Sequence, residues 1–195
     1  MKESKSHRNL RALCEGAVMI ALSQLLGYLK LFSLPSGGSI TLNMLPIFFY
    51  CYRWGFGRGM LASAAFAVLQ LIGDRALFVG WQSVFGDYLL AYGVLGVAGL
   101  FWKQPHGFFT GVTVGTLARF LVAWSVGATV WAEYMPDRFF GMTMTSPWLY
   151  SALYNGSYLL PDLTLCLLCG LLLRRVLARW FVPQLPASPG DKTDP

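Results

Sequence analysis

The chain is poor in charged residues, and this scarcity indicates that it folds in a lipid bilayer and not in water. Only 12% of its 195 residues are Asp, Glu, Lys or Arg, 55% are hydrophobic, and the mean hydropathy is +0.52. An average soluble domain is about 25% charged. No polar segment between the apolar runs is long enough for a soluble domain, so the sequence predicts an all-α integral membrane protein.

Histidine and cysteine are scarce as well, which argues against several kinds of catalysis. His7 and His106 lie in polar segments, so neither a Ser/His hydrolase nor a His-ligated metal site within the membrane is supported. Cys166 and Cys169 have C-x-x-C spacing, but no second pair or nearby His completes a ligand set. The ATP-binding loop G-x-x-x-x-G-K-[ST] is also absent. We expect no enzymatic activity, no metal and no cofactor.

Six apolar runs are candidate membrane spans. The second is short for a helix that must cross about 30 Å of hydrocarbon, and the turn-rich segment LPSGGSITLN precedes it. We expect that segment to dip into the bundle or cap it. Pro46 suits the first turn of the second helix, and Pro161 predicts a kink or a break in the last one. The predicted spans are Leu10 to Phe32, Leu42 to Tyr52, Gly57 to Ile72, Val84 to Trp102, Gly107 to Trp131 and Tyr150 to Phe181.

The basic residues predict the orientation. Six spans place both termini on one side, which receives eleven of the fifteen basic residues, so we expect both termini in the cytoplasm. The net charge of +6 then reflects topology and not a nucleic-acid surface. We predict one six-helix membrane domain over residues 1–182 and a disordered cytoplasmic tail over the proline-rich residues 183–195. The eleven basic residues are Lys2, Lys5, Arg8, Arg11, Arg53, Arg58, Lys103, Arg174, Arg175, Arg179 and Lys192.

Polar and aromatic residues gather where the fourth span begins, the fifth ends and the sixth begins, all at the extracellular face. A carboxylate among Trp and Tyr rings suits an organic cation, because the rings attract positive charge and the carboxylate supplies the counter-charge. A side-chain amide can orient a heteroaromatic edge. Trp and Tyr also anchor helices at any membrane interface, so each aromatic has that alternative role. The candidate site residues are Asp87, Trp131, Trp148, Tyr150, Tyr154 and Asn155.

Two further ionisable residues fall within spans. Glu15 lies near the inner end of the first, where we expect it to pair with a cytoplasmic Arg. Arg119 lies in the middle of the fifth and cannot face lipid. We expect it to pair with a carboxylate or with helix carbonyls, and a ligand contact is the alternative. Ala17 and Ala21, four residues apart, put small side chains on one helix face. Another helix can therefore pack closely there, either within the bundle or from a partner protein.

Three segments in order, LPSGGSITLNMLPIFFYCYRWG, WQSVFGDYLLAYGVLGVAGLF and SPWLYSALYNGSYLLPDL, resemble the thiamine-specific substrate-binding subunit (S component) of energy-coupling factor (ECF) transporters. The resemblance implies a bacterial cell-membrane protein of six helices with an outward vitamin pocket closed by the first loop. It also implies a transmembrane coupling protein and two ATPase subunits as partners, with Ala17 and Ala21 in the docking face. Asp87, Trp131, Tyr150 and Asn155 fall on ligand contacts of that family.

Two family contacts are absent. The family's helix-five His falls on Ala123, with Trp124 beside it, and a Trp after the first loop falls near Leu42 and Asn43. The expected ligand is therefore thiamine or a related cationic vitamin, with another pyrimidine or thiazole compound as the alternative.

Two other classes of function compete with this interpretation. A self-sufficient proton-coupled vitamin carrier would use Arg119, Asp87 and Asp162 as a charge relay. An intramembrane enzyme would need paired aspartates, and Asp74, Asp87 and Asp162 lie in three separate regions.

Overall fold

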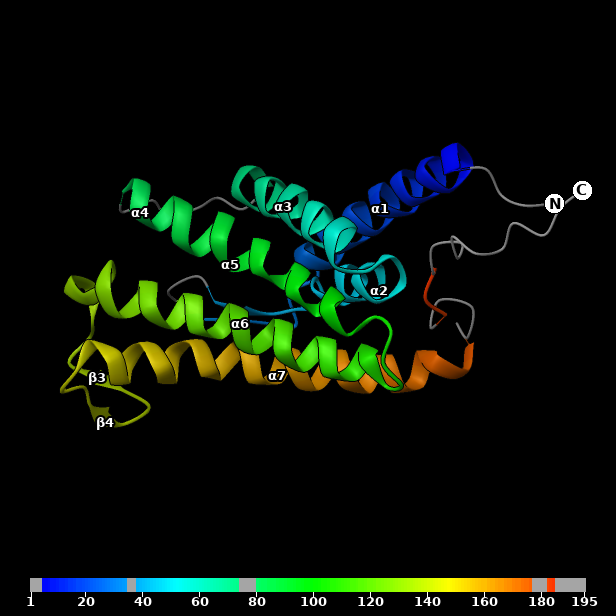
Figure 1. The fold of residues 1–195 in the computed structure, drawn as a ribbon. Helices are drawn as coiled ribbons and strands as arrows, with labels where there is room; N and C mark the ends of the chain where they lie inside the picture. Colours follow the sequence, from blue (N-terminus) through cyan, green and yellow to red (C-terminus); the bar gives the residue numbers. More distant parts are fainter. Residues whose placement is uncertain (1–4, 35–37, 74–79, 177–181, 185–195) are drawn as a thin grey trace, which may run out of the picture.

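The structure, a computed structural model, describes residues 5–34, 38–73, 80–176 and 182–184. Five helical segments of this part are long and apolar enough to cross a bilayer, as a multi-pass membrane protein requires. The start of the first and the end of the last lie at the same end of the molecule (Figure 1). The five are α1 (Lys5–Tyr28), α3 (Phe56–Gly73), the segment Trp81–Phe101, α6 (Gly107–Thr129) and α7 (Pro147–Val176).

The second predicted span is the short helix α2 (Leu45–Trp54) in the middle of the bundle (Figure 1). Its ten residues rise only about 15 Å, half the hydrocarbon thickness. All but one of them are buried, and Pro46 lies in the first turn as expected. The core of the molecule forms around this helix. Its fully buried side chains include Ile47, Phe48, Phe66, Leu95, Val112 and Leu159.

The segment Trp81–Phe101 is a continuous helix whose winding changes along its length. After α4 (Trp81–Ser83) comes the π-helical η1 (Val84–Leu90), then α5 (Ala91–Gly93) and the 3₁₀-helical η2 (Val94–Phe101). The π-helical turn is a wide form that is frequent at functional sites, and it contains Asp87. Regular helical periodicity could not predict which way this carboxylate points.

Two short hairpins lie in the connections between helices, and the second is at the end of the bundle opposite to the start of α1 (Figure 1). In the first, β1 (Phe32–Ser33) pairs with β2 (Ser39–Ile40), so the turn-rich segment after α1 doubles back on itself. In the second, β3 (Arg138–Phe139) pairs with β4 (Met142–Thr143) beyond the short helix η3 (Ala132–Tyr134) (Figure 1). Its two-residue turn, Phe140 and Gly141, has positive φ at both positions, as a tight hairpin requires.

Pro161 does not break the last helix. The sequence predicts a kink or a break there, but α7 runs as one helix over 30 residues with Pro161 inside it, so the predicted break is wrong. A membrane helix tolerates one missing N–H where neighbouring helices pack around it, and α7 packs closely along α6 (Figure 1). The predicted tail lies mostly outside the described residues. Of the described part, Gln184 donates its backbone N–H to the carbonyl oxygen of Arg53 at 2.8 Å.

Glu15 pairs with arginine as predicted. Its carboxylate accepts hydrogen bonds from Arg53 Nε at 2.7 Å, Trp54 Nε1 at 2.8 Å and Arg11 Nε at 2.9 Å. Arg53 is buried, so this network fixes the first half of α1 against α2. The opposite face of α1 is apolar and exposed, and it includes Ala17 and Ala21 together with Leu13, Val18 and Leu25.

Glycines let the 3₁₀ segment η2 approach its neighbours backbone to backbone. A Cβ on Gly99 would lie 2.7 Å from backbone atoms of Gly55 and Phe56, and one on Gly96 would lie 2.6 Å from Met60 Cα. Close contact of this kind drives helix association in lipid, where the hydrophobic effect between helices is absent. A Cβ on Gly93, on the same continuous helix, would have no neighbouring atom within 4 Å.

The two glycine environments give a matched stability test. Gly99→Ala should lower the free energy of unfolding by about 1–3 kcal/mol, because the new methyl group overpacks a rigid backbone contact. Gly93→Ala should leave it unchanged or slightly higher. Thermal unfolding of the detergent-solubilised variants measures both, and equal melting temperatures would contradict the packing described here.

Candidate functional site

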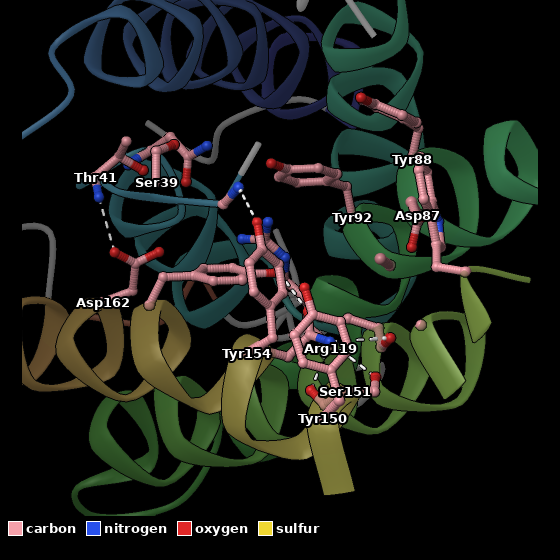
Figure 2. A pocket seen from close by; sticks show the side chains of 18 of the residues that line it. Ser39, Thr41, Asp87, Tyr88, Tyr92, Arg119, Tyr150, Ser151, Tyr154 and Asp162 are labelled. Atoms are coloured by element: carbon pink, nitrogen blue, oxygen red, sulfur yellow. Dashed lines mark hydrogen bonds between the residues drawn. The ribbon is translucent and has the colours of Figure 1, made fainter. Parts of the chain in front are cut away.

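A cavity of about 660 Å³ opens among η1, α5, α6, α7 and the segment that follows β1. Such a volume is within the range of about 300–1,000 Å³ typical of small-molecule sites. Side chains of α7 form one wall, and those of Asp87, Tyr88 and Tyr92 form the facing one (Figure 2). The sequence prediction that distant spans converge at one end of the bundle is therefore confirmed.

A repeat of four residues brings α6 and α7 side chains into the cavity. Arg119, Ala123, Gly127 and Trp131 line it from α6 and the residues just beyond its end. From α7 come Tyr150, Tyr154, Tyr158 and Asp162, with Ser151 and Asn155 beside them. Residues four apart share one helix face, and twelve residues rise about 18 Å. The cavity thus has an outer end at Trp131 and Tyr150 and an inner end at Arg119 and Asp162.

At the outer end a carboxylate holds an indole ring. Trp131 Nε1 donates to Asp87 Oδ2 at 2.7 Å, and the Trp131 ring packs edge-on against Tyr134 with centroids 5.8 Å apart. This hydrogen bond fixes the face of the indole. Asp87 keeps its second oxygen and its negative charge for another partner. A fixed aromatic face beside a carboxylate is an arrangement that attracts an organic cation.

The side-chain amide of Asn155 is hydrogen-bonded to neighbouring residues. Its Nδ2 donates to the carbonyl oxygen of Ser151 at 2.9 Å and lies 3.3 Å from that of Ala123, while its Oδ1 accepts from Tyr158 Oη at 2.6 Å. Asn155 therefore joins α6 to α7 and holds the Tyr158 hydroxyl in the cavity wall. This is a larger positioning role than the sequence suggests.

Two hydrogen bonds tie the first hairpin and the segment after it to α7. The backbone N–H of Gly38 donates to Tyr154 Oη at 2.8 Å, and that of Thr41 donates to Asp162 Oδ1 at 2.8 Å (Figure 2). Gly38, Ser39, Thr41 and Asn43 also line the cavity. These contacts agree with the expectation that the segment dips into the bundle or caps it, because Thr41 and Asn43 are buried against the cavity wall.

Arg119 lines the cavity, and the structure shows neither of the two expected pairings, with a carboxylate or with helix carbonyls, among the described residues. Its side chain is buried and its guanidinium carbon lies 4.0 Å from the centroid of the Tyr92 ring. Among the described residues no ion pair joins it to a carboxylate, and its Nη1 has no hydrogen-bond partner. The alternative of a ligand contact fits this placement better.

Five of the six candidate site residues line the cavity: Asp87, Trp131, Tyr150, Tyr154 and Asn155. Trp148 does not, because its side chain is half exposed and packs against Trp124 with ring centroids 5.3 Å apart. Trp124 donates its indole N–H to the carbonyl oxygen of Trp148 at 2.9 Å and is not a lining residue either. Trp124 therefore does not reach the cavity beside Ala123, which lines it.

The sequence prediction omitted several lining residues. Tyr158 and Asp162 follow Tyr150 and Tyr154 at the same spacing of four, so extending the repeat along the helix would have found them. Tyr92 and Asn43 carry no such signal, since their positions depend on the π-helical turn and on the hairpin. In the described part of the chain no group of three His, Cys, Asp or Glu residues is placed to hold a metal ion.

Comparison with known proteins agrees with this architecture. A family model described as thiamine transporter protein matches residues 13–182. The thiamine transporter ThiT of Bacillus subtilis (strain 168) is 26% identical over 85% of this chain and 90% of its own length. The ThiT of Lacticaseibacillus paracasei is 24% identical over 92% of this chain and 94% of its own.

A solved structure shares the fold. ThiT from Listeria monocytogenes aligns with a TM-score of 0.79 at 21% identity, over 90% of this chain and all of that one. The match of the family model extends from within α1 to just past the end of α7, so it includes every element that lines the cavity. The chain is therefore a member of the thiamine transporter protein family.

Proposed function

We propose that the chain is the substrate-binding membrane subunit of an ECF-type transporter and that it captures thiamine from outside the cell. The observation that carries the proposal is the hydrogen bond from Trp131 to Asp87 in an aromatic cavity of a thiamine transporter family member. Thiamine has a cationic thiazolium ring joined by a methylene group to an aminopyrimidine. The fixed indole face suits the thiazolium, and the Asp87 carboxylate supplies its counter-charge.

The remaining candidate residues form the walls around the rest of the ligand. The rings of Tyr150 and Tyr154 lie tilted against one another with centroids 5.7 Å apart, and Phe139 of the second hairpin packs edge-on against Tyr150 at 5.3 Å. Asn155 holds Tyr158 in the same wall. Trp148 supports this end of α7 through its contacts with Trp124. Such aromatic walls with a few oriented polar groups are typical of small-molecule sites.

The alternative ligand is a related pyrimidine or thiazole compound. Ala123 leaves space in the wall where the family carries a His, and Trp124 does not fill it. A ligand with only one of the two thiamine rings would occupy part of the cavity. Relative affinities for thiamine and for its separate pyrimidine and thiazole halves distinguish the two cases.

For the topology, we propose six passes with both termini in the cytoplasm. The short helix α2 makes one pass together with the buried turn segment 41–44 between β2 and α2, which is tied to Asp162 at Thr41. This arrangement keeps its backbone out of contact with lipid, as a non-helical segment at membrane depth requires. The excess of Lys and Arg at the ends of α1 and α7 favours the cytoplasm for that end.

For energy coupling, we propose a transmembrane coupling protein and two ATPase subunits as partners. The chain contains no ATP-binding loop of its own. The exposed apolar face of α1 that contains Ala17 and Ala21 would receive the coupling protein, since small side chains allow close helix packing. The competing proposal, a self-sufficient proton-coupled carrier, predicts uptake by this chain alone.

Binding of thiamine to the purified chain tests the function directly. Isothermal titration after removal of any co-purified vitamin should give tight binding at one site. Asp87→Ala should abolish detectable binding, because it leaves the cation without its counter-charge and Trp131 without its hydrogen bond. Glu133→Ala, which removes an exposed carboxylate near the same end, is the matched control and should bind as the wild type does. Retained affinity in Asp87→Ala would refute the site.

The aromatic contact has its own test. Trp131→Ala should weaken binding by about 1–3 kcal/mol, the loss expected for a desolvated cation–π contact with its packing. Trp81→Ala removes an indole that is 75% exposed and should have no effect on affinity. Equal affinities of the two variants would mean that Trp131 does not contact the ligand.

Coupling is tested by transport. Liposomes that contain only this chain should take up no thiamine against a gradient, whereas liposomes with a coupling protein and ATPases should. Ala17→Trp and Ala21→Trp should reduce ATP-driven uptake at least tenfold while leaving thiamine affinity unchanged, because the bulk blocks close helix approach. Ala64→Trp on the exposed side of α3 is the matched control. Uptake by the isolated chain would favour the carrier.

A further inference from the structure

The helices α1, α2 and α3 contain one acidic residue between them, Glu15. Both oxygens of its carboxylate are already engaged. Oε1 accepts hydrogen bonds from Arg11 Nε at 2.9 Å and Arg53 Nη2 at 3.3 Å. Oε2 accepts from Arg53 Nε at 2.7 Å and Trp54 Nε1 at 2.8 Å. Since a carboxylate offers about four acceptor positions, Glu15 has none left for another basic side chain.

Arg58, in the first turn of α3, lies beside this network without a carboxylate of its own. Its Nη2 donates to Asn9 Oδ1 at 2.7 Å, and its guanidinium carbon lies 4.7 Å from the centroid of the Trp54 ring. Both contacts are with neutral groups, and within the described ranges no ion pair joins Arg58 to an acidic residue. The fold therefore orients the positive charge of Arg58 but does not neutralise it.

The surroundings make this charge more unfavourable. Trp54 contacts Arg58 with its ring and Glu15 with its indole N–H, and Arg11 binds the same Glu15 carboxylate, so the two arginines flank one hydrogen bond. The Arg11 side chain is 44% exposed. Like charges repel, and the first turn of α3 contains no acidic residue to offset the positive end of the helix dipole. An anion held by both arginines would offset all of these charges.

Exposed apolar side chains surround the two arginines. Leu10 precedes Arg11 on α1, and Phe56 and Leu61 lie on either side of Arg58 along α3. A phospholipid can place its phosphate group at the arginines and its acyl chains along these side chains, whereas a soluble anion gains nothing from them. The headgroup of a zwitterionic lipid also carries a cation, for which Glu15 has no free acceptor position. The chemistry of this surface therefore favours an anionic phospholipid.

We propose that Asn9, Arg11, Trp54 and Arg58 form a binding site for the phosphate group of an anionic phospholipid. The two guanidinium groups donate to the phosphate oxygens, whose geometry matches the planar fork of arginine. Asn9 and Trp54 position Arg58. The lipid bridges α1 and α3, which lie side by side, and so stabilises the helix that carries the proposed docking face (Figure 1). None of these four residues lines either cavity.

Native mass spectrometry of the full chain tests the site. The protein is reconstituted with equal amounts of phosphatidylglycerol and phosphatidylcholine of identical acyl chains, and the lipids that it retains are counted. The wild type should retain phosphatidylglycerol selectively. Arg58→Gln should lower this preference about fivefold, the factor that one basic residue contributes near an anionic lipid. Arg138→Gln, which removes an exposed arginine from the second hairpin, is the matched control and should keep it. Equal preferences in wild type and Arg58→Gln would overturn the site.

Two further measurements separate lipid binding from a purely structural role of Arg58. Arg58→Lys keeps the charge and should regain part of the preference that Arg58→Gln loses, so equal losses in both variants would contradict the proposal. Phosphatidylglycerol should raise the melting temperature of the wild type and of Arg138→Gln, but not that of Arg58→Gln, because a ligand of the folded state stabilises it.

Inorganic phosphate in excess distinguishes the lipid from a soluble anion. It should leave the retained phosphatidylglycerol in place, because phosphate has no acyl chains to pack against α1 and α3. Displacement of the lipid by phosphate would overturn the assignment of a lipid site. These measurements use no thiamine, so their outcome is independent of the proposed function.

Discussion

Inside a bilayer no water is available to satisfy polar groups, and the placement of the polar side chains in this protein follows from that constraint. Glu15 is satisfied by Arg53, Trp54 and Arg11, and these bonds hold α1 against α2. Asn155 is satisfied by Ser151 and Tyr158, and its contacts join α7 to α6. The unsatisfied buried atoms of Arg119 and Asn43 both belong to residues that line the cavity. They are two of the six described buried side-chain atoms without a hydrogen-bond partner, and the other four belong to residues that do not line this cavity.

The cavity needs both regular and irregular helix. A spacing of four residues keeps one stripe of α6 and one of α7 facing each other over three turns, so small residues such as Ala123 and Gly127 open a space that the tyrosines of α7 surround. The facing wall is irregular. The π-helical η1 carries Asp87 close enough to Trp131 for a hydrogen bond of 2.7 Å. The regular helices α6 and α7 determine the length of the cavity, and the π-helical η1 determines the position of the Asp87 carboxylate.

The sequence predicts the helical membrane fold, the Glu15 pair and the convergence of Asp87, Trp131 and Tyr150, because hydropathy and burial of charge depend on local composition. It fails where long-range packing decides. The continuity of α7 through Pro161 depends on the helices packed around it, and the short α2 depends on the hairpin before it. Trp148 and Trp124 look like ligand aromatics but contact each other instead. That Arg119 faces the cavity could not be predicted, because it depends on the relative positions of three helices.

One helix, α7, both forms a wall of the cavity and holds the segment from Gly38 to Thr41 that covers it. Tyr154 and Asp162, two turns apart on α7, accept the hydrogen bonds that hold the hairpin segment at Gly38 and Thr41, and both side chains also line the cavity. A ligand between these walls is therefore enclosed by groups already fixed in position, which lowers the entropy lost on binding. Because the hydrogen bond at Thr41 lies two residues from Asn43, it also helps to fix the Asn43 side chain in the cavity wall.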